Sequence, residues 1–294
     1  MRNLLKIAAF WLVATHALAQ SPQTEAGPDT TVAVLPEERR WRLGVAVGYG
    51  ERSNPLIQSD DIPVVIDLDI AWFGDRWFFD NGDLGLSLAD NRWFTTNLVA
   101  RVNSDRTFFG KTNTRLVNFQ LLAGGATGEL VNGATGEPIA EDVRLPLKPP
   151  KRDYAVEVGF ETLFDGEWGQ ASLRGFHDVS GTHEGYEISA DYSYRITRGR
   201  FSVAPSVGLS WKSAALSDYY WGVHRDEVSS TLAFYEARAG LGWESGIRAS
   251  YYLSKSARLA LSANYESLQH SVAQSPLIER DYVIGYFAGI GWQF

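Results

Sequence analysis

The sequence of 294 residues predicts an all-β fold, a transmembrane antiparallel β-barrel of about twelve strands. Three observations support this fold. Apolar and polar residues alternate with a period of two from Trp41 onward. Several of the alternating runs reach the ~9–11 residues that a tilted strand needs to cross a bilayer. The last run ends on an aromatic residue, Phe294, which resembles the carboxy-terminal signal of bacterial outer-membrane barrels.

The amino terminus has the pattern of a signal peptide. Arg2 and Lys6 precede the apolar run 7–13, and Ala17-Leu18-Ala19 supplies the small-x-small pattern that a signal peptidase recognises. We therefore expect residues 1–19 to be a signal peptide that is cleaved after Ala19. Residues 20–40 contain three prolines and show no period, so they predict a flexible periplasmic leader before a barrel at 41–294.

Charge and composition exclude several classes of function. The formal net charge of the chain is −8, and cleavage after Ala19 would leave 25 basic and 35 acidic residues. Such an acidic protein lacks the broad basic surface of a nucleic-acid-binding protein, so we expect no nucleic acid partner. The chain also has no cysteine, which excludes disulfides, thiolate metal sites and cysteine nucleophiles.

The alternation is clearest in two runs, residues 186–196 and 201–211. In the second run Val207 lies on an apolar face, and its neighbour Ser206 lies on a face of small and polar residues. A soluble lectin-like sandwich, the alternative, would have strands of ~5–6 residues with its charges outside. Long strands with aromatic ends and one polar face favour a membrane barrel with an apolar outer wall and a polar lumen.

Turn signals divide the chain into strands. We expect strands at about 41–50, 62–73, 75–81, 82–89, 92–103, 153–164, 167–177, 185–196, 200–212, 244–253, 256–268 and 280–294. The pair at 75–89 is short. If that pair forms one strand or folds inward, another early segment must drop out and the total becomes ten, because such barrels have an even number of strands.

Connections of two lengths alternate along the predicted barrel. Short turns at 89–91, 165–167, 197–199 and 254–256 are expected on the periplasmic side. Long outer loops are expected at 51–61, 104–150, 178–184, 213–233 and 269–280. The glycine- and proline-containing segment 104–150 is far longer than an ordinary connection, and it predicts a surface loop or a plug in the lumen. Residues 116–123 fit both a short helix and a strand.

Charged residues recur on the predicted lumen face. Asp67 and Asp69 lie there, together with five arginines, namely Arg42, Arg174, Arg195, Arg248 and Arg258. We expect a charge-paired, solvated interior, and the alternative is a selectivity lining for a narrow pore. Barrels of ten to twelve strands fall between filled barrels and open channels, so strand number leaves this open. Asp60-Asp61 and the Asp67/Asp69 pair are also candidates for cation binding or acid–base work.

Patterns that would carry catalysis are weak. His177, His183, His224 and His270 do not form HExxH, HxH or Glu-x-x-His arrangements. His270-Ser271 is the one adjacent pair of the kind used by outer-membrane hydrolases, and we interpret it as two polar loop residues. We therefore predict no catalytic, cofactor-binding or metal-binding residues, no cofactor, and a protein that is not an enzyme.

Aromatic residues cluster at Tyr219-Tyr220-Trp221 in the predicted loop 213–233. They predict either an aromatic girdle or a loop folded over the mouth of the barrel. The alternative is a platform that stacks on glycans, or an adhesive tip.

Several segments of the chain carry specific motifs. Residues 58–61 precede the strand 63–73, and 74–88 carries a Trp-Phe-Phe and a Gly-Leu pattern. Ser217 to Val223 contains Tyr-Tyr-Trp-Gly-Val, and Ser275 to Arg280 begins with Ser-Pro-Leu-Ile before the last strand. These segments resemble the MltA-interacting protein / OmpV (MipA/OmpV) family of outer-membrane proteins, to whose Tyr-Tyr-Gly-Val and Ser-Pro-Leu-Val boxes the last two are similar, with Trp221 as an extra residue.

The resemblance implies a barrel in the outer membrane of a Gram-negative cell, in contact with outer-membrane lipid. It implies a non-enzymatic scaffold that holds a lytic transglycosylase, which is a murein hydrolase, near a bifunctional murein synthase in peptidoglycan assembly. The alternative is a narrow outer-membrane pore or a surface adhesin involved in osmotic or antibiotic response.

Overall fold

The computed structural model describes residues 41–109, 117–118, 149–229 and 232–294. These residues all belong to the unit Glu37–Phe294. Its strands are β1 (Trp41–Arg52), β2 (Ile62–Phe73), β3 (Trp77–Asp80), β4 (Asp83–Asp90), β5 (Phe94–Val102), β6 (Val117–Asn118), β7 (Val156–Gly166), β8 (Gly169–Asp178), β9 (Tyr186–Ser193), β10 (Ile196–Arg198), β11 (Phe201–Lys212), β12 (Gly240–Tyr252), β13 (Ala257–Ser267) and β14 (Tyr282–Gln293). The predicted signal peptide and leader lie outside the described residues and stay predictions.

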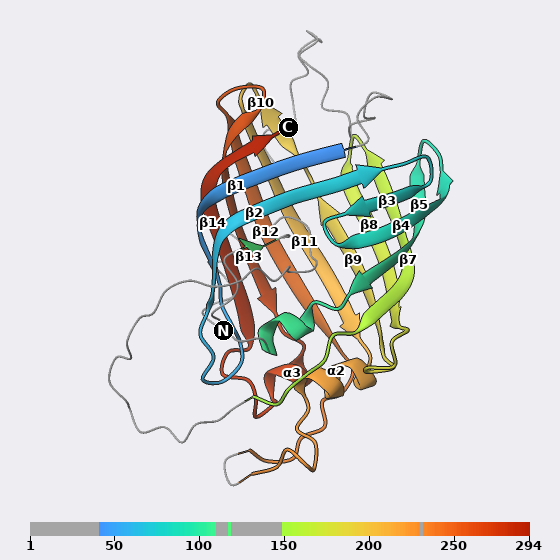
Figure 1. Ribbon diagram of the computed structural model, residues 1–294, viewed down its shortest axis with the longest axis vertical. Coiled ribbons are helices and arrows are strands. Elements are labelled where there is room, and N and C mark those ends of the chain that lie inside the picture. Colours follow the sequence, from blue (N-terminus) through green and yellow to red (C-terminus); the bar gives the residue numbers. More distant parts are fainter. Residues whose placement is uncertain (1–40, 110–116, 119–148, 230–231) are drawn as a thin grey trace, which may run out of the picture. The chain divides into compact units, whose positions relative to one another are not determined.

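Twelve strands form one closed antiparallel barrel (Figure 1). Neighbours along the chain pair with each other, and β1 closes the ring by pairing with both β14 and β2. The short β10 continues β9, and both pair with β11. The prediction of twelve strands is confirmed, because β3 and β4 are separate strands of the wall.

The apolar face of the strands points outward. Val207 and Leu209 are 54% and 51% exposed, whereas Ser202 on the other face of β11 is buried. A soluble protein would not leave a continuous apolar face in water, but a lipid bilayer covers one. The predicted assignment of the two faces is therefore confirmed, and the sandwich alternative is wrong.

Aromatic side chains form bands at both ends of the wall, as is typical of membrane barrels. One band contains the ring pairs Trp41–Trp72, Phe94–Phe164 and Trp168–Tyr192, with centroids 6.3–6.5 Å apart. The other contains Tyr186–Trp211, Trp243–Tyr265 and Tyr265–Tyr282, with centroids 5.3–5.7 Å apart. The distance between the bands marks the part of the wall that faces lipid.

The two ends of the barrel differ in their connections. The short-turn end carries the turns 74–76, 91–93, 167–168, 199–200 and 253–256 and the terminal Phe294. Gly199 has a φ of 58° there, a value that favours glycine. The long-loop end carries the loops 53–61, 103–155, 179–185, 213–239 and 268–281. These loops contain the 3₁₀ turn η1 (Asp105–Phe109) and the helices α2 (Ala214–Trp221) and α3 (His270–Ala273), which lie opposite β10 and the C-terminus in Figure 1.

Glycines line the lumen side where β1 meets β14. A Cβ atom on Gly48 would lie 2.1 Å from the carbonyl oxygen of Ala288, so no larger residue fits there. The register of β1 against β2 also shifts between Val47 and Gly50. Glycine therefore lets the wall bend tightly at this corner.

The contact between β2 and β3 is short. Three residue pairs join these strands, whereas twelve join β11 to β12. Nearer the long-loop end of β2, Ile66 and Asp67 pair with the parallel strand β6, which belongs to the segment 104–150. Residues 117–118 are therefore strand and not helix. The rest of 110–148 lies outside the described residues. In the described part of the chain, no helix is long and apolar enough to cross a membrane.

Candidate functional site

The loops at the long-loop end pack around a common apolar core, which we call the loop core. Its buried members come from four loops and two strand ends, namely Leu56, Ile62, Phe108, Leu216, Tyr220, Trp221, Val223, Leu232, Ala237, Val272, Leu277 and Val283. Large apolar side chains in loops rarely have enough neighbours to become buried unless the loops pack on one another. These loops therefore form a folded cover over this end of the barrel.

Trp221 occupies the centre of the loop core. Its side chain is 2% exposed, and its ring centroid lies 5.7 Å from that of Phe108 and 5.3 Å from that of Phe109. The helix that carries it begins after Ser213, whose hydroxyl accepts a hydrogen bond from the Leu216 amide at 3.4 Å. The predicted loop folded over the mouth is confirmed for Tyr220 and Trp221, and the girdle alternative is wrong for them.

A buried ion pair fastens the end of α2 to the neighbouring loops. The Arg152 guanidinium donates to the Gly222 carbonyl at 2.9 Å and forms a two-point ion pair with Glu227. Burial alone would raise the pKa of Glu227, but hydrogen bonds from Arg152 and from the His224 amide outweigh it and hold the pKa below its ordinary value. The Glu227 carboxylate is therefore charged at neutral pH, and its ion pair with Arg152 joins the loop 103–155 to the loop 213–239.

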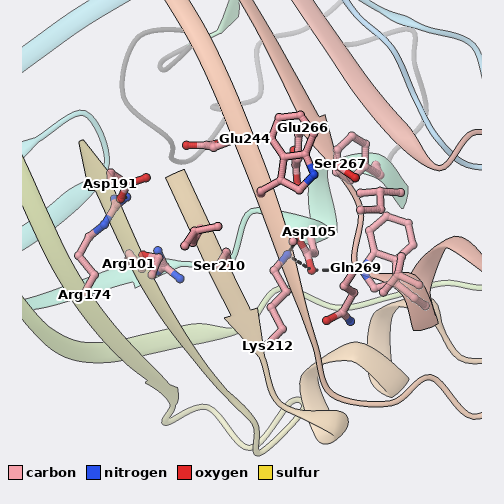
Figure 2. Close-up of a pocket in the computed structure, with 18 residues that line it drawn as sticks. Arg101, Asp105, Arg174, Asp191, Ser210, Lys212, Glu244, Glu266, Ser267 and Gln269 are labelled. Carbon is pink, nitrogen blue, oxygen red and sulfur yellow. Dashed lines mark hydrogen bonds and ion pairs between the residues drawn. The ribbon is translucent and has the colours of Figure 1, made fainter. Parts of the chain in front are cut away.

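A second ion pair joins the loop core to the barrel wall. Lys212, the last residue of β11, points into the lumen and donates to both carboxylate oxygens of Asp105 at 2.7 and 2.8 Å. Asp105 also accepts a hydrogen bond from the Trp221 indole at 3.2 Å. Since one carboxylate contacts the wall and the helix, it holds η1 inside the mouth of the barrel (Figure 2).

Charged side chains continue down the lumen from this point. Arg101 bridges Glu157 at 2.9 Å and Glu187 at 2.6 Å, and Arg174 forms an ion pair with Asp191. A cavity of about 110 Å³ lies among Arg101, Arg174, Lys212 and the loop core, with Glu244 and Glu266 on its other side (Figure 2). This small cavity between a charged wall and an apolar cover is the candidate site.

The predicted charge pairing of the lumen is confirmed in part. Arg42 lies 3.1 Å from Asp69 and 2.9 Å from Asp80. By contrast, Arg195, Arg248 and Arg258 have no ion pair within 4.0 Å among the described residues. The prediction is wrong for these three, because the acidic residues of the neighbouring strands lie at other levels of the barrel.

The other carboxylates singled out from the sequence have structural partners. Asp61 accepts two hydrogen bonds from Arg280 at 2.9 and 3.1 Å and joins two loops. Asp67 is buried, and it interacts electrostatically with Asp69 and with the Arg258 guanidinium. Asp69 is paired with Arg42 at 3.1 Å, so Asp61 and Asp69 both serve as partners of arginines.

His270 and Ser271 begin α3 and do not act together. The Ser271 hydroxyl accepts a hydrogen bond from the Arg238 amide at 2.5 Å, and its carbonyl accepts one from the Tyr235 hydroxyl at 2.6 Å. In the described ranges no hydrogen bond joins Ser271 to a histidine. His183 is instead the buried histidine, 3.3 Å from Glu157, and Gly185 donates to its other ring nitrogen.

Sequence reasoning missed Asp105 and Lys212. Lys212 could have been found, since it continues the lumen face of the run 201–211 by one residue. Asp105 carries no such signal, because it lies in a loop and its partner is 107 residues away.

A protein-family model described as "MltA-interacting protein MipA" matches residues 43–294. Among curated relatives, the putative outer membrane protein YiaT of Escherichia coli K12 is 27% identical over 159 residues, which cover 54% of this chain and 65% of that protein. OmpV of Vibrio cholerae is 26% identical over 53% of this chain and 63% of its own length. The chain thus spans less than two thirds of these relatives.

Two further matches complete the comparison. The MltA-interacting protein of Escherichia coli K12 is 31% identical over 110 residues, which cover 34% of this chain and 41% of that protein. Among solved structures, the chain is similar to a loop L8 deletion mutant of OmpT, an outer membrane protein of Vibrio cholerae. That match has 7% identity and a TM-score of 0.32 and covers 86% of this chain and 98% of the other.

Proposed function

Because the chain belongs to the MltA-interacting protein family of outer-membrane β-barrels, we propose that it is a non-enzymatic scaffold. In this role it holds a lytic transglycosylase near a bifunctional murein synthase, so that wall cleavage and synthesis occur together. The protein resides in the outer membrane, and its short-turn end faces the periplasm, where both enzymes would act.

The loop core is the observation that carries this proposal. Its apolar packing covers the long-loop end, and the Lys212–Asp105 ion pair attaches that cover to the wall. A channel needs a continuous path for water, whereas a scaffold needs a rigid body with an accessible surface on the partner's side. The described residues fit a rigid scaffold better than an open channel.

The short-turn end offers a surface for such partners. Trp93 and Trp168 are 65% and 52% exposed near the turns 91–93 and 167–168, and Arg92 stacks over Trp93 at 4.3 Å. Tryptophan and arginine are enriched at the centres of protein interfaces. We propose that these turns, together with the leader 20–40, contact the murein enzymes.

Site-specific photo-crosslinking in cells tests this role. A photoreactive amino acid replaces Trp93 or Trp168 at the short-turn end and, as a matched control, the exposed Phe234 at the long-loop end. We expect adducts with a lytic transglycosylase and a murein synthase from the two tryptophan positions alone. Adducts with neither enzyme from either position, or the same adducts from Phe234, would contradict the scaffold.

The charged cavity supports a second candidate, a narrow pore. Arg101, Arg174 and Lys212 face Glu244 and Glu266 across it, an arrangement that could select small ions. Conductance in planar bilayers separates the candidates. The scaffold predicts no steady conductance for the natural chain, and a reproducible single-channel current would favour the pore.

A further inference from the structure

Six basic side chains gather at the short-turn end without partners. They lie on the adjacent strands β10 to β13 and their turns, namely Arg195, Arg198, Arg200, Arg248, Lys255 and Arg258. Throughout the part of the chain that the structure describes, none of the six side chains forms an ion pair within 4.0 Å or a hydrogen bond. The chain as a whole has a net charge of −8, so this end carries a local excess of positive charge that could attract an anionic ligand.

Two of the arginines flank one small residue on the lumen face. Arg248 of β12 lies opposite Ala204 of β11 in the strand register. On the other side of β11, the Tyr194 amide bonds to the Pro205 carbonyl, which brings Arg195 level with Ala204. Adjacent strands are about 4.7–4.9 Å apart, so the backbones at Arg195 and Arg248, on either side of β11, are separated by about 10 Å. Between these two arginines the lumen face carries only the methyl group of Ala204.

Tyr194 and Ile196 are exposed on the outer wall, so Arg195 between them points into the lumen. Arg195 and Arg248 also repel each other electrostatically. A negatively charged group placed between them would remove that repulsion and could accept hydrogen bonds from both guanidinium groups.

The lumen face next to Arg248 carries a small residue with a hydroxyl group. Ser262 of β13 lies opposite Arg248, and its buried hydroxyl oxygen has no hydrogen-bond partner among the described residues. Further toward the turns, the Arg258 side chain passes over Gly291, with its Nε 3.6 Å from the position of an added Cβ. Two carboxylates, Asp67 and Glu244, interact electrostatically with Arg258 and Arg248 but form no ion pair with them.

The geometry points to a phosphate-binding site in the periplasmic mouth of the lumen, formed by Arg195 and Arg248 with the Ser262 hydroxyl. A phosphate group offers several acceptor oxygens and up to two charges, so it can accept hydrogen bonds from both guanidinium groups and from the hydroxyl at once. The phosphate would belong either to a lipid headgroup of the inner leaflet or to a soluble molecule of the periplasm. This inference is independent of the scaffold role.

Calorimetric titration with inorganic pyrophosphate tests the site. The full chain is held in phosphatidylcholine nanodiscs at constant ionic strength. The mouth variant is R195Q/R248Q, and the matched control is R198Q/R200Q, which removes the same charge from the rim. Heat-modifiable migration in gels verifies that each variant forms a barrel.

We expect the mouth variant to bind pyrophosphate about tenfold more weakly or worse, since it loses several charge-assisted hydrogen bonds, and the rim variant to change the affinity by less than about threefold. Adding phosphatidylglycerol to the nanodiscs distinguishes the sources: competition with pyrophosphate indicates a lipid headgroup, and unchanged affinity indicates a soluble ligand. Absence of binding by the natural chain, or equal loss in both variants, would overturn the proposal.

Discussion

Two groups of basic side chains, one at each end of the barrel, differ in whether they contact carboxylates. At the long-loop end, Arg101, Arg152 and Lys212 each contact a carboxylate within 3.0 Å. At the short-turn end, Arg42 pairs with Asp69 and Asp80, but Arg195 and Arg248 contact no carboxylate within 4.0 Å in the described chain. Arg101 and Lys212 line the same lumen as Arg195 and Arg248, so the difference follows from what surrounds them.

Water explains the difference. The loop core covers the first group, and a buried charge without a partner is very costly. The second group lies at the mouth on the other side, where Arg195 is exposed and water can solvate it. Charges under the cover therefore serve to hold loops, whereas charges at the open mouth remain available to a ligand. The predictions below test this contrast.

Removing the centre of the loop core should have the largest effect. Trp221→Ala deletes a ring that is 2% exposed and contacts two phenylalanines, so we expect the free energy of unfolding to fall by about 3–5 kcal/mol. Urea titration of the full chain in lipid vesicles measures the loss. The control Phe234→Ala, at a position that is 46% exposed, should change it by less than about 0.5 kcal/mol. Equal effects would mean that the loops do not form a cooperative cover.

The comparison of the two ends also assumes that one face of each strand points to lipid and the other to the lumen. Val207→Arg places a charge on the lipid side and should cost about 2–4 kcal/mol, whereas Ser206→Arg faces the lumen and should cost far less. Cysteine labelling is the more direct measurement, since the chain has no native cysteine. A lipid-soluble maleimide should reach Val207→Cys, and equal aqueous labelling of Val207→Cys and Ser206→Cys would break the assignment.

The wall could be predicted from the sequence because its signal is local. Alternation with a period of two identifies the outer face of β11 and the positions of twelve strands without any knowledge of their partners. Turn residues likewise locate the short turns to within a few positions. The closed barrel follows from these, since every strand edge in a membrane must be paired.

The site could not be predicted in the same way, because its contacts join distant segments. Lys212 was missed, although its parity in the run 201–211 would have placed it on the lumen side, and nothing near it indicates Asp105 as its partner. Arg195, Arg248 and Arg258 were correctly placed on that face, yet their lack of partners depends on the level at which each acidic residue lies in the barrel. That level is set by the stagger of twelve strands, which no single strand encodes.

Acid should weaken the long-loop end through Glu227. Its pKa is lowered in the folded protein, so the ion pair with Arg152 stabilises the fold above the ordinary carboxyl value of 4.5, and this stabilisation is lost as the pH falls through the folded pKa. At pH 7 we expect Glu227→Gln to be about 1–3 kcal/mol less stable than the natural chain. The stability difference between the two proteins, measured by urea titration at several pH values, should shrink below about pH 4. A difference that is constant with pH would contradict the role of this ion pair.

The smallest effect is expected where a cation has no partner. Among the described residues Arg248→Gln breaks no ion pair, and it removes both the repulsion from Arg195 and the attraction to Glu244, so the free energy of unfolding should change by less than about 0.5 kcal/mol. Arg101→Gln is the matched change under the cover, and it should cost about 3–5 kcal/mol because Glu157 and Glu187 are left without their shared partner. Both variants keep a side chain that hydrogen-bonds, so the comparison isolates the charge. Urea titration in vesicles of neutral lipid measures both. If Arg248→Gln proved as costly as Arg101→Gln, the mouth arginine would be part of the fold, and its charge would not be free for a ligand.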